Sequence, residues 1–375
     1  MTVTGRKKIG IDARLYFQTG VGVYVRNLLH YLQLLDTSKF EFFIYILEKD
    51  KNNIKFLQPN FHLRVVNSKW HTLSEQVVFL AELYKDNLDL MHFTYFSHPI
   101  LYKRPCIATI HDTILLQLKT GKASTQNSLL YELKHKAFSL ALSSQVKHAR
   151  QIITPTNEIK KQLISIYGEK YVKKIQPLYE GVNFELVDAE ESPKLAYNPE
   201  KPFFIYVGNF YPHKNVESLI EAFKDVDPTY ELILIGPDDF FSKRIVELVH
   251  TRGLQERVIF KHNISNQELK WYYKHALALI HPSRSEGFGL PLIEASYFKC
   301  PVIASDIAVF KELLGTAYWS FNPESIGDIT KKIKDFIKDK AGHTLKEQKN
   351  PLHAYSFEKM TQEILSLYEK NSYRL

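Results

Sequence analysis

The sequence predicts an α/β protein built from two doubly wound domains. Short apolar runs, typical of buried strands, alternate with segments of helical spacing over residues 8–180, and the alternation restarts at residue 203. Between the two series, residues 181–202 are rich in proline and acidic residues and have no periodicity, which indicates a linker or surface loop. At 375 residues the chain is long enough for two domains, each with its own core.

The first series begins with an apolar run at residue 8. Its predicted strands are residues 8–13, 40–47, 63–66, 88–92, 106–110 and 152–153. Its predicted helices are residues 25–35, 74–84, 126–147 and 157–167. Thr156 is a suitable N-cap for the last of these, and the helix 126–147 is basic and amphipathic.

The second series repeats the pattern. Its predicted strands are residues 203–207, 232–235, 258–260, 278–280 and 302–304. Its predicted helices are residues 216–224, 240–252, 266–275, 291–298, 325–339 and 356–368. Asp225-Val226-Asp227 spells a D-x-D metal motif, but it follows a helix and precedes Pro228, so it is interpreted as a turn.

Composition is that of an ordinary globular protein, with 45% hydrophobic and 24% charged residues. Cys106 and Cys300 stand in no metal-ligand or redox spacing, so a reducing cytosol is expected. Residues 1–8 are basic but precede no apolar segment of a signal peptide, and no apolar run approaches the length of a membrane span.

Charge is unevenly distributed along the chain. Residues 1–180 hold 25 Lys and Arg against 14 Asp and Glu, a net charge of +11, and the remaining 24 and 27 give −3, which together match the total of +8. A basic first half suggests an acidic partner, either an anionic membrane surface or a phosphate-bearing acceptor. No nucleic-acid-binding motif is present, so nucleic acid is not expected as a partner.

The segment His281 to Ile303 contains the clearest binding signal. Gly287-Phe288-Gly289 lies between a predicted strand and a predicted helix, with Pro291 suited to the first helical position. Glycines let the backbone approach a ligand, and the N–H groups of a helix start bind phosphate. Glu286 and Glu294 flank this point, and carboxylates accept hydrogen bonds from hydroxyls. Two acids eight positions apart are by themselves often only solvated, but with the glycines they fit a sugar nucleotide.

Three further features bear on function. Lys214 precedes a predicted helix, where it could meet a diphosphate as a point charge or remain a solvated loop lysine. His111 ends a predicted strand, with Asp112 and His92 as weaker candidates of the same kind. Gly20-Val21-Gly22 lacks the third glycine of a dinucleotide fingerprint because Val25 occupies that place, so NAD binding is not favoured.

The string P-S-x-x-E-G-F-G-L-P-x-x-E-A followed by P-V-I-A-S resembles the donor-site signature of retaining glycosyltransferases of family 4, which have the GT-B fold. I-D-A-R…T-G-x-G-x-Y, T-I-H-D-T and G-N-F-Y-P-H-K-N are similar to other segments of that family. The resemblance implies two Rossmann-like domains facing each other across a cleft. The expected boundaries are residues 1–182 for the acceptor side, 183–350 for the nucleotide-sugar side, and 351–375 for a helix crossing back to the first domain.

The resemblance also implies roles for individual residues. Those implied to be catalytic are His111, Lys214 and Glu286. Those implied to bind the donor are Gly20, Gly22, Gly208, Asn209, Lys214, Ser283, Glu286, Gly287, Phe288, Gly289, Leu290 and Glu294. Glu286 would hold sugar hydroxyls and Glu294 the ribose. Many relatives carry arginine at the position of Asn209 and some at His213, so neutralisation of the diphosphate is expected to depend more on Lys214.

The implied activity is retaining transfer of a hexose from a nucleotide sugar by front-face substitution, without metal or other cofactor. The first-domain and Y-V-G-N-F-Y-P-H-K-N strings most resemble bacterial mannosyltransferases of surface polysaccharide synthesis, which implies GDP-mannose as the donor. The expected acceptor is a saccharide or a lipid-linked saccharide, and the expected location is the cytoplasm, with peripheral contact at the inner face of the membrane. The alternatives are a GT-B sugar-nucleotide epimerase and a non-catalytic nucleotide-sugar-binding subunit.

Overall fold

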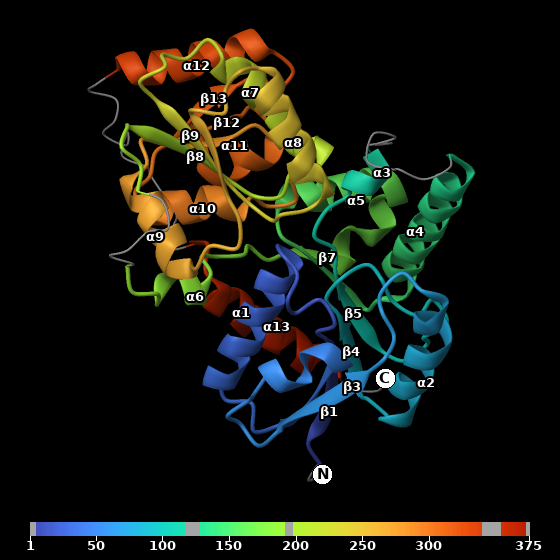
Figure 1. Ribbon diagram of the computed structural model, residues 1–375. Coiled ribbons are helices and arrows are strands. Elements are labelled where there is room, and N and C mark those ends of the chain that lie inside the picture. Colours follow the sequence, from blue (N-terminus) through green and yellow to red (C-terminus); the bar gives the residue numbers. More distant parts are fainter. Residues whose placement is uncertain (1–4, 118–127, 192–197, 340–353, 373–375) are drawn as a thin grey trace. The chain divides into compact units, whose positions relative to one another are not determined.

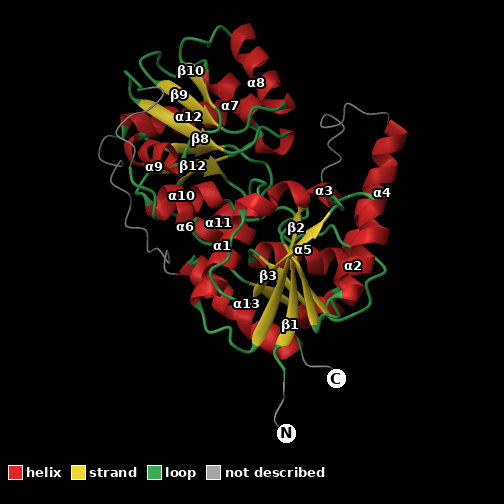
Figure 2. Cartoon of the chain, turned by 60° about the horizontal axis from the view of Figure 1, so that its bottom comes forward, coloured by secondary structure: helices red, strands yellow, loops and turns green. Residues whose placement is uncertain are grey.

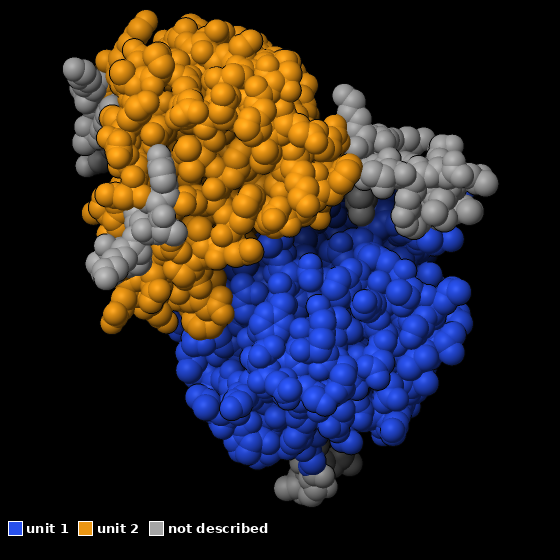
Figure 3. All heavy atoms as spheres, in the orientation of Figure 1, with its two compact units in different colours: residues 1–119, 126–180, 356–375 blue, residues 120–125, 181–355 orange. Residues whose placement is uncertain are grey.

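The computed structural model describes residues 5–117, 128–191, 198–339 and 354–372 (Figure 1). Side chains of residues 115, 117 and 128–134 are outside the description. The chain divides into two compact units, coloured separately in Figure 3. Unit 1 comprises residues 1–119, 126–180 and 356–375, and unit 2 comprises residues 120–125 and 181–355.

Unit 1 contains a parallel sheet, whose strands are yellow in Figure 2 around the label β1. It has seven strands in the order β3-β2-β1-β4-β5-β6-β7. The strands are β1 (Lys7–Asp12), β2 (Phe40–Leu47), β3 (Phe61–Val66), β4 (Leu90–Phe93), β5 (Cys106–Thr109), β6 (Gln151–Thr154) and β7 (Ile175–Pro177). The chain moves outward from β1 to β3 and then returns to β4 on the other side of β1. The topological switch point therefore lies between β1 and β4, where ligands of doubly wound sheets commonly bind.

Helices cover both faces of this sheet. The α-helices are α1 (Val21–Leu34), α2 (Leu80–Lys85), α3 (Ile114–Gln117), α4 (Ser128–His148), α5 (Asn157–Tyr167) and α13 (Phe357–Asn371). The other helical segments are the π-helical turn η2 (Glu75–Phe79) and the 3-10 helices η1 (Glu48–Asn53) and η4 (Glu169–Lys174). Apolar side chains of η2, α2, α4 and α5 pack on one face, and α1 packs against α13 on the other. The last helix of the chain is thus part of unit 1.

A buried ion cluster joins the loop after β1 to two neighbouring segments of unit 1. The Arg14 guanidinium donates to Asp12 at 2.7 and 2.9 Å and to Glu75 of η2 at 2.7 Å. Ser97, in the loop after β4, also donates to Glu75. Because every charge in the cluster is paired, it fixes these loops at the switch point without leaving an unsatisfied buried group.

Unit 2 contains a second parallel sheet, of six strands in the order β10-β9-β8-β11-β12-β13. The strands are β8 (Phe203–Val207), β9 (Glu231–Ile235), β10 (Val258–Lys261), β11 (Leu279–His281), β12 (Val302–Ser305) and β13 (Trp319–Phe321). The helices are α6 (Phe184–Val187), η5 (Pro212–Lys214), α7 (Val216–Phe223), α8 (Phe240–Thr251), α9 (Asn266–His275), α10 (Leu290–Tyr297), α11 (Ala308–Leu314) and α12 (Ile326–Lys338). Here the switch point lies between β8 and β11.

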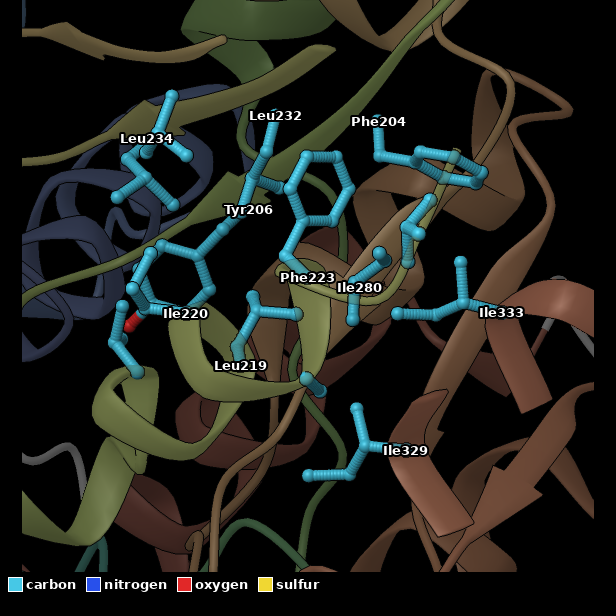
Figure 4. Packing of buried hydrophobic residues seen from close by; sticks show 14 of the residues in the cluster. Phe204, Tyr206, Leu219, Ile220, Phe223, Leu232, Leu234, Ile280, Ile329 and Ile333 are labelled. Atoms are coloured by element: carbon cyan, nitrogen blue, oxygen red, sulfur yellow. The ribbon is translucent and has the colours of Figure 1, made fainter. Parts of the chain in front are cut away.

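The core of unit 2 forms where α7, α8 and α12 cover one face of its sheet. Phe204, Tyr206 and Leu232 of the strands meet Leu219 and Phe223 of α7, with Ile329 and Ile333 of α12 beyond them (Figure 4). All are fully buried. This packing holds β8 and the start of α7 rigidly, so the loop between them is supported at both ends.

The two-domain α/β prediction is confirmed, and the strand and helix positions agree to within one to three residues at most ends. Thr156 caps α5 as expected, its side chain accepting from the N–H of Ile159. Asp227 accepts from the N–H of Thr229 in a turn after α7, in agreement with the interpretation of the D-x-D string. The described part of the predicted helix 126–147 begins at Ser128, and its first two residues lie outside the description.

Several short elements were not predicted. β7 and β13 are three-residue strands at the sheet edges, too short to show a period. α6 lies inside the predicted linker, and it forms because the Asn183 side chain accepts from the N–H of Glu185 at its start. α3 and α11 were also missed. Among the residues described, no helix is both long and apolar enough to cross a bilayer.

Candidate active site

The loop from β11 to α10 contains most of the predicted donor-binding residues. β11 ends at His281, and α10 begins at Leu290 with Gly289 as its N-cap, so Pro291 is the second helical residue. Gly289 has φ +114°, and a Cβ there would lie 3.0 Å from the Phe310 ring. Glycine is required at this position because the backbone is left-handed and the space is filled.

An ion pair joins this loop to the loop after β8. Lys214 Nζ lies 2.6 and 2.8 Å from the two carboxylate oxygens of Glu286, and their side chains are 15% and 8% exposed. Burial alone raises the pKa of Glu286, but the Lys214 charge and the His281 N–H outweigh that effect and hold the pKa well below its usual range. Glu286 is therefore an anion, and it lies beside the switch point between β8 and β11.

Two more side chains orient the Glu286 carboxylate. Ser283 Oγ donates to it at 2.7 Å, and His281 Nε2 donates to the same oxygen at 3.0 Å. Burial lowers the pKa of His281, so the ring is neutral and its Nδ1 carries no proton. That Nδ1 is buried and has no hydrogen-bond partner among the described residues. The sequence pattern did not single out His281, since a histidine at a strand end carries no local signal of its partner.

The loop after β8 is held by backbone and side-chain hydrogen bonds. The buried Tyr206 hydroxyl donates to the carbonyl of Asn209, and the N–H of Gly208 donates to Ile235 at 2.9 Å. The N–H of Arg284 donates to the carbonyl of His213 at 2.8 Å, which ties the two loops together. Burial, with the Lys214 charge, lowers the pKa of His213 to about 4. His213 is therefore neutral near pH 7 and supplies no positive charge beside Lys214.

Glu294, on α10, has a different environment. It is 7% exposed, and the one hydrogen bond of its carboxylate to a described residue comes from the Tyr273 hydroxyl of α9, at 2.8 Å. Burial raises the pKa of Glu294 to about 7, although the Tyr273 hydroxyl opposes the shift. Tyr273 also was not predicted, because its contact joins two helices that are distant in sequence.

The remaining donor-binding candidates of unit 2 lie around the same loop. Ser283, Gly287 and Phe288 are buried, and the Phe288 ring packs edge-on against Tyr355. Leu290 begins α10. The structure therefore gathers Lys214, Ser283, Glu286 and the Gly287–Gly289 segment around one strand-to-helix connection. Their roles in catalysis stay predictions.

His111 lies at the carboxyl edge of the unit 1 sheet. Its Nε2 is 2.9 Å from the carbonyl oxygen of Thr94, and its Nδ1 is 3.3 Å from a carboxylate oxygen of Glu180. The Tyr24 ring packs edge-on against the imidazole, with centroids 4.8 Å apart. Because a carbonyl only accepts hydrogen bonds, Nε2 carries a proton. Tyr24 is the last residue of the T-G-x-G-x-Y string, and Glu180 was not predicted.

Gly20 precedes α1 in the same unit, and Gly22 is the second residue of that helix. Gly20 is the N-cap of α1, with φ +62°. A Cβ on Gly22 would lie 2.7 Å from the carbonyl oxygen of Tyr16 and 2.9 Å from that of Leu15. Gly22 therefore allows the loop after β1 to fold back on the helix start, and this packing accounts for the glycine without a ligand.

The two weaker candidates make contacts of a structural kind. His92 is fully buried, with Nδ1 2.7 Å from Tyr368 of α13 and Nε2 2.8 Å from Thr109, and burial lowers its pKa to about 3. Asp112 accepts from the N–H of Ile114 at 2.9 Å at the start of α3. Both interactions satisfy interior or helix-end groups.

The pKa of Glu294 generates a stability prediction. The pKa of the Glu294 carboxyl is 4.5 in the unfolded chain and about 7 in the folded protein. Between these values the unfolded state loses its proton first, so the stability of the wild type should fall as pH rises from about 4.5 to 7. Compared with that of Glu294→Gln, the free energy of unfolding of the wild type should fall by on the order of 3 kcal/mol over this range. Above pH 7 the difference between the two proteins should stay constant.

Urea unfolding of the wild type and Glu294→Gln across this pH range measures the difference. Glu256→Gln is the matched control, since Glu256 is exposed in the same unit and its difference from the wild type should not change with pH. A difference between wild type and Glu294→Gln that is independent of pH contradicts the raised pKa.

Residues 187–352 match the model of the family described as glycosyl transferases group 1. The O-antigen chain mannosyltransferase RfbU of Salmonella typhimurium is 29% identical over 260 residues, covering 68% of this chain and 71% of RfbU. The serotype-specific mannosyltransferase WbdA of Escherichia coli is 31% identical over 219 residues, which are 54% of this chain and 27% of WbdA. An uncharacterized glycosyltransferase of Methanocaldococcus jannaschii is 26% identical over 366 residues, 94% of this chain and 95% of its own length.

Solved structures show the same fold at low sequence identity. Sucrose-phosphate synthase from Thermosynechococcus elongatus has a TM-score of 0.77 at 20% identity and covers 97% of this chain and 99% of its own. WaaG, a glycosyltransferase involved in lipopolysaccharide biosynthesis, has a TM-score of 0.66 at 14% identity, with 97% and 96% covered. The relatives and the two parallel-sheet units together show a glycosyltransferase with the GT-B fold, and residues 187–352 of this chain are similar to the group 1 family.

Proposed function

We propose that this glycosyltransferase moves mannose, with retention, from GDP-mannose to a saccharide or lipid-linked saccharide in surface polysaccharide synthesis. The observation that carries the proposal is the largely buried Lys214–Glu286 pair, 15% and 8% exposed, beside the switch point of unit 2. Such a pair offers a cation for a diphosphate and a carboxylate for sugar hydroxyls in one place. The names of RfbU and WbdA support mannose and a polysaccharide product.

Lys214 is the proposed electrostatic catalyst. An ammonium has three N–H donors, and two of the Lys214 contacts are to Glu286 oxygens, so the third donor remains for a phosphate oxygen. As the bond between C1 of the sugar and the diphosphate breaks, negative charge grows on the phosphate. Lys214 and the backbone N–H groups at the start of α10 would stabilise that charge, and no metal ion is required by this scheme.

The proposed reaction is substitution on one face of the sugar. The acceptor oxygen forms its bond to C1 on the face from which the diphosphate leaves, and the acceptor proton passes to a phosphate oxygen of the leaving group. Glu286 would hold sugar hydroxyls, since Ser283 and His281 fix its carboxylate in place. Glu294 would accept from the ribose, and His111 would contact the transferred sugar.

One surface of unit 1 supports contact with a membrane. We define the η2 patch as Leu73, Val77, Val78 and Leu101, which are 86%, 69%, 47% and 65% exposed. The Gln76 side chain bonds to the carbonyl of His98 and the N–H of Ile100, so residues 98–101 lie beside η2. An apolar patch on a segment with a net charge of +11 suits an anionic lipid surface, where a lipid-linked acceptor would be present.

Turnover tests the site. Lys214→Ala and Glu286→Ala should each lower kcat about a hundredfold or more, because each removes a contact to charge or hydroxyls in the transition state. Lys274→Ala is the matched control, since Lys274 forms an exposed ion pair with Glu191 in the same unit and should leave kcat unchanged. Product formation is measured with EDTA throughout.

Circular dichroism verifies that both site variants are folded. A kcat near that of the wild type in both variants would contradict the assignment of Lys214 and Glu286 to the catalytic site. Loss of wild-type turnover on chelation, restored by manganese or magnesium, would contradict the metal-independent scheme.

Calorimetric titration tests the donor. The wild type should bind GDP-mannose more tightly than UDP-glucose or UDP-N-acetylglucosamine. Binding of a UDP-sugar with no measurable affinity for GDP-mannose would refute the donor, while leaving the fold and the class of reaction unchanged.

Cosedimentation with phosphatidylglycerol vesicles tests the membrane contact. The affinity of the double variant Leu73→Ser/Val77→Ser for these vesicles should be at least about tenfold lower than that of the wild type, because two apolar side chains no longer enter the lipid. Leu57→Ser is the control, since Leu57 is 93% exposed but lies beside Gln33 of α1, outside the patch. Equal binding by all three proteins, or no binding by the wild type, contradicts the proposal.

A further inference from the structure

Glu180 is a buried carboxylate of unit 1 with unused hydrogen-bonding capacity. It follows β7, and its side chain is 6% exposed. The one hydrogen-bond contact that it makes to a described residue is with His111 Nδ1, at 3.3 Å, which is long for a bond to a charged group. A carboxylate accepts several hydrogen bonds, and buried charged groups are usually fully paired.

Two other buried acids of unit 1, Asp12 and Glu75, show what full pairing looks like. Asp12 accepts three hydrogen bonds from Arg14, and Glu75 accepts from Arg14, from Ser97 and from the N–H of His71. These acids are structural. Glu294, by contrast, has a single partner and is the predicted ribose ligand. Glu180 resembles Glu294 in this respect, because its carboxylate is buried but has only one hydrogen-bond contact to a described residue.

The position of Glu180 also indicates a ligand. Glu180, His111 and Thr94 follow β7, β5 and β4, and parallel strands place their carboxyl ends at one edge of a sheet, where ligands of this fold class bind. His111 is immobilised there by the Thr94 carbonyl and the Tyr24 ring. Its Nδ1 side and the Glu180 carboxylate therefore form one fixed polar surface.

We propose that Glu180 binds a saccharide hydroxyl at this surface, together with His111. The hydroxyl donates to a Glu180 oxygen and so supplies a hydrogen bond that none of the described residues provides. A cationic ligand is disfavoured by the net charge of +11 on residues 1–180. The inference rests on the proposed glycosyl transfer, and the hydroxyl belongs either to the transferred hexose or to the acceptor saccharide.

The stability of Glu180→Gln separates a binding role from a structural one. Replacing an incompletely paired buried carboxylate by a neutral amide of the same shape should leave the Tm unchanged or raise it, because the desolvated charge is removed. Glu169→Gln, at an exposed glutamate eleven positions earlier in unit 1, is the matched control and should not change the Tm.

Calorimetry with GDP-mannose and with GDP identifies the source of the hydroxyl. If it belongs to the transferred hexose, Glu180→Gln should weaken GDP-mannose binding about tenfold or more and leave GDP binding unchanged. If it belongs to the acceptor, both affinities and the slow hydrolysis of GDP-mannose should be unchanged. The KM for octyl α-mannoside as acceptor should then rise about tenfold or more.

A lower Tm for Glu180→Gln, with unchanged affinities and unchanged acceptor KM, would overturn the inference and make Glu180 a structural partner of His111. Failure of the wild type to bind any nucleotide sugar contradicts the proposed function instead, and this result is visible without the variant. If another nucleotide sugar binds, the same comparison is made with that donor and its nucleoside diphosphate.

Discussion

The Lys214–Glu286 ion pair is the interaction on which the candidate site depends. It joins the connection after β8 to the connection after β11, and these strands flank the switch point of the unit 2 sheet. Glu286 is buried and Lys214 is 15% exposed, and a buried carboxylate is stabilised by a paired cation, so the ion pair favours contact between the two loops. The backbone bond from Arg284 to His213 and the bonds from the Asn215 side chain to the carbonyls of Pro282 and Pro323 hold the same contact.

A pair of this kind adds little to stability, but it organises a binding site before the ligand arrives. Desolvation offsets most of the Coulomb attraction of buried ions. The main effect of the pair is therefore to orient its side chains, and the hydrogen bonds from Ser283 and His281 further fix the position of the Glu286 carboxylate. A preorganised carboxylate and ammonium need no reorganisation when charge develops on a phosphate, and this is the condition for electrostatic catalysis.

Residues of the same type have different roles in this protein because their surroundings differ. His92 and His281 are both buried and neutral, but His92 uses both ring nitrogens within the core of unit 1, whereas His281 directs one toward Glu286. His111 is fixed by a carbonyl and faces an incompletely paired acid. The same division separates Glu75, fully paired by structural donors, from Glu180. Residue type alone carries none of this information.

The sequence by itself determined the two-domain α/β architecture, because the period of apolar residues reports which side of a strand or helix is buried. It also indicated the strand-to-helix connection around Gly287–Gly289 and the acids Glu286 and Glu294, because glycine and helix-start signals are local. It missed β7 and β13, since a three-residue edge strand has no period. Only the tertiary structure decided that Lys214 pairs with Glu286, that Tyr273 holds Glu294 and that Glu180 meets His111. Each of these contacts joins residues from 21 to 72 positions apart, and which loops meet depends on the order of strands in the sheet, which no local pattern records.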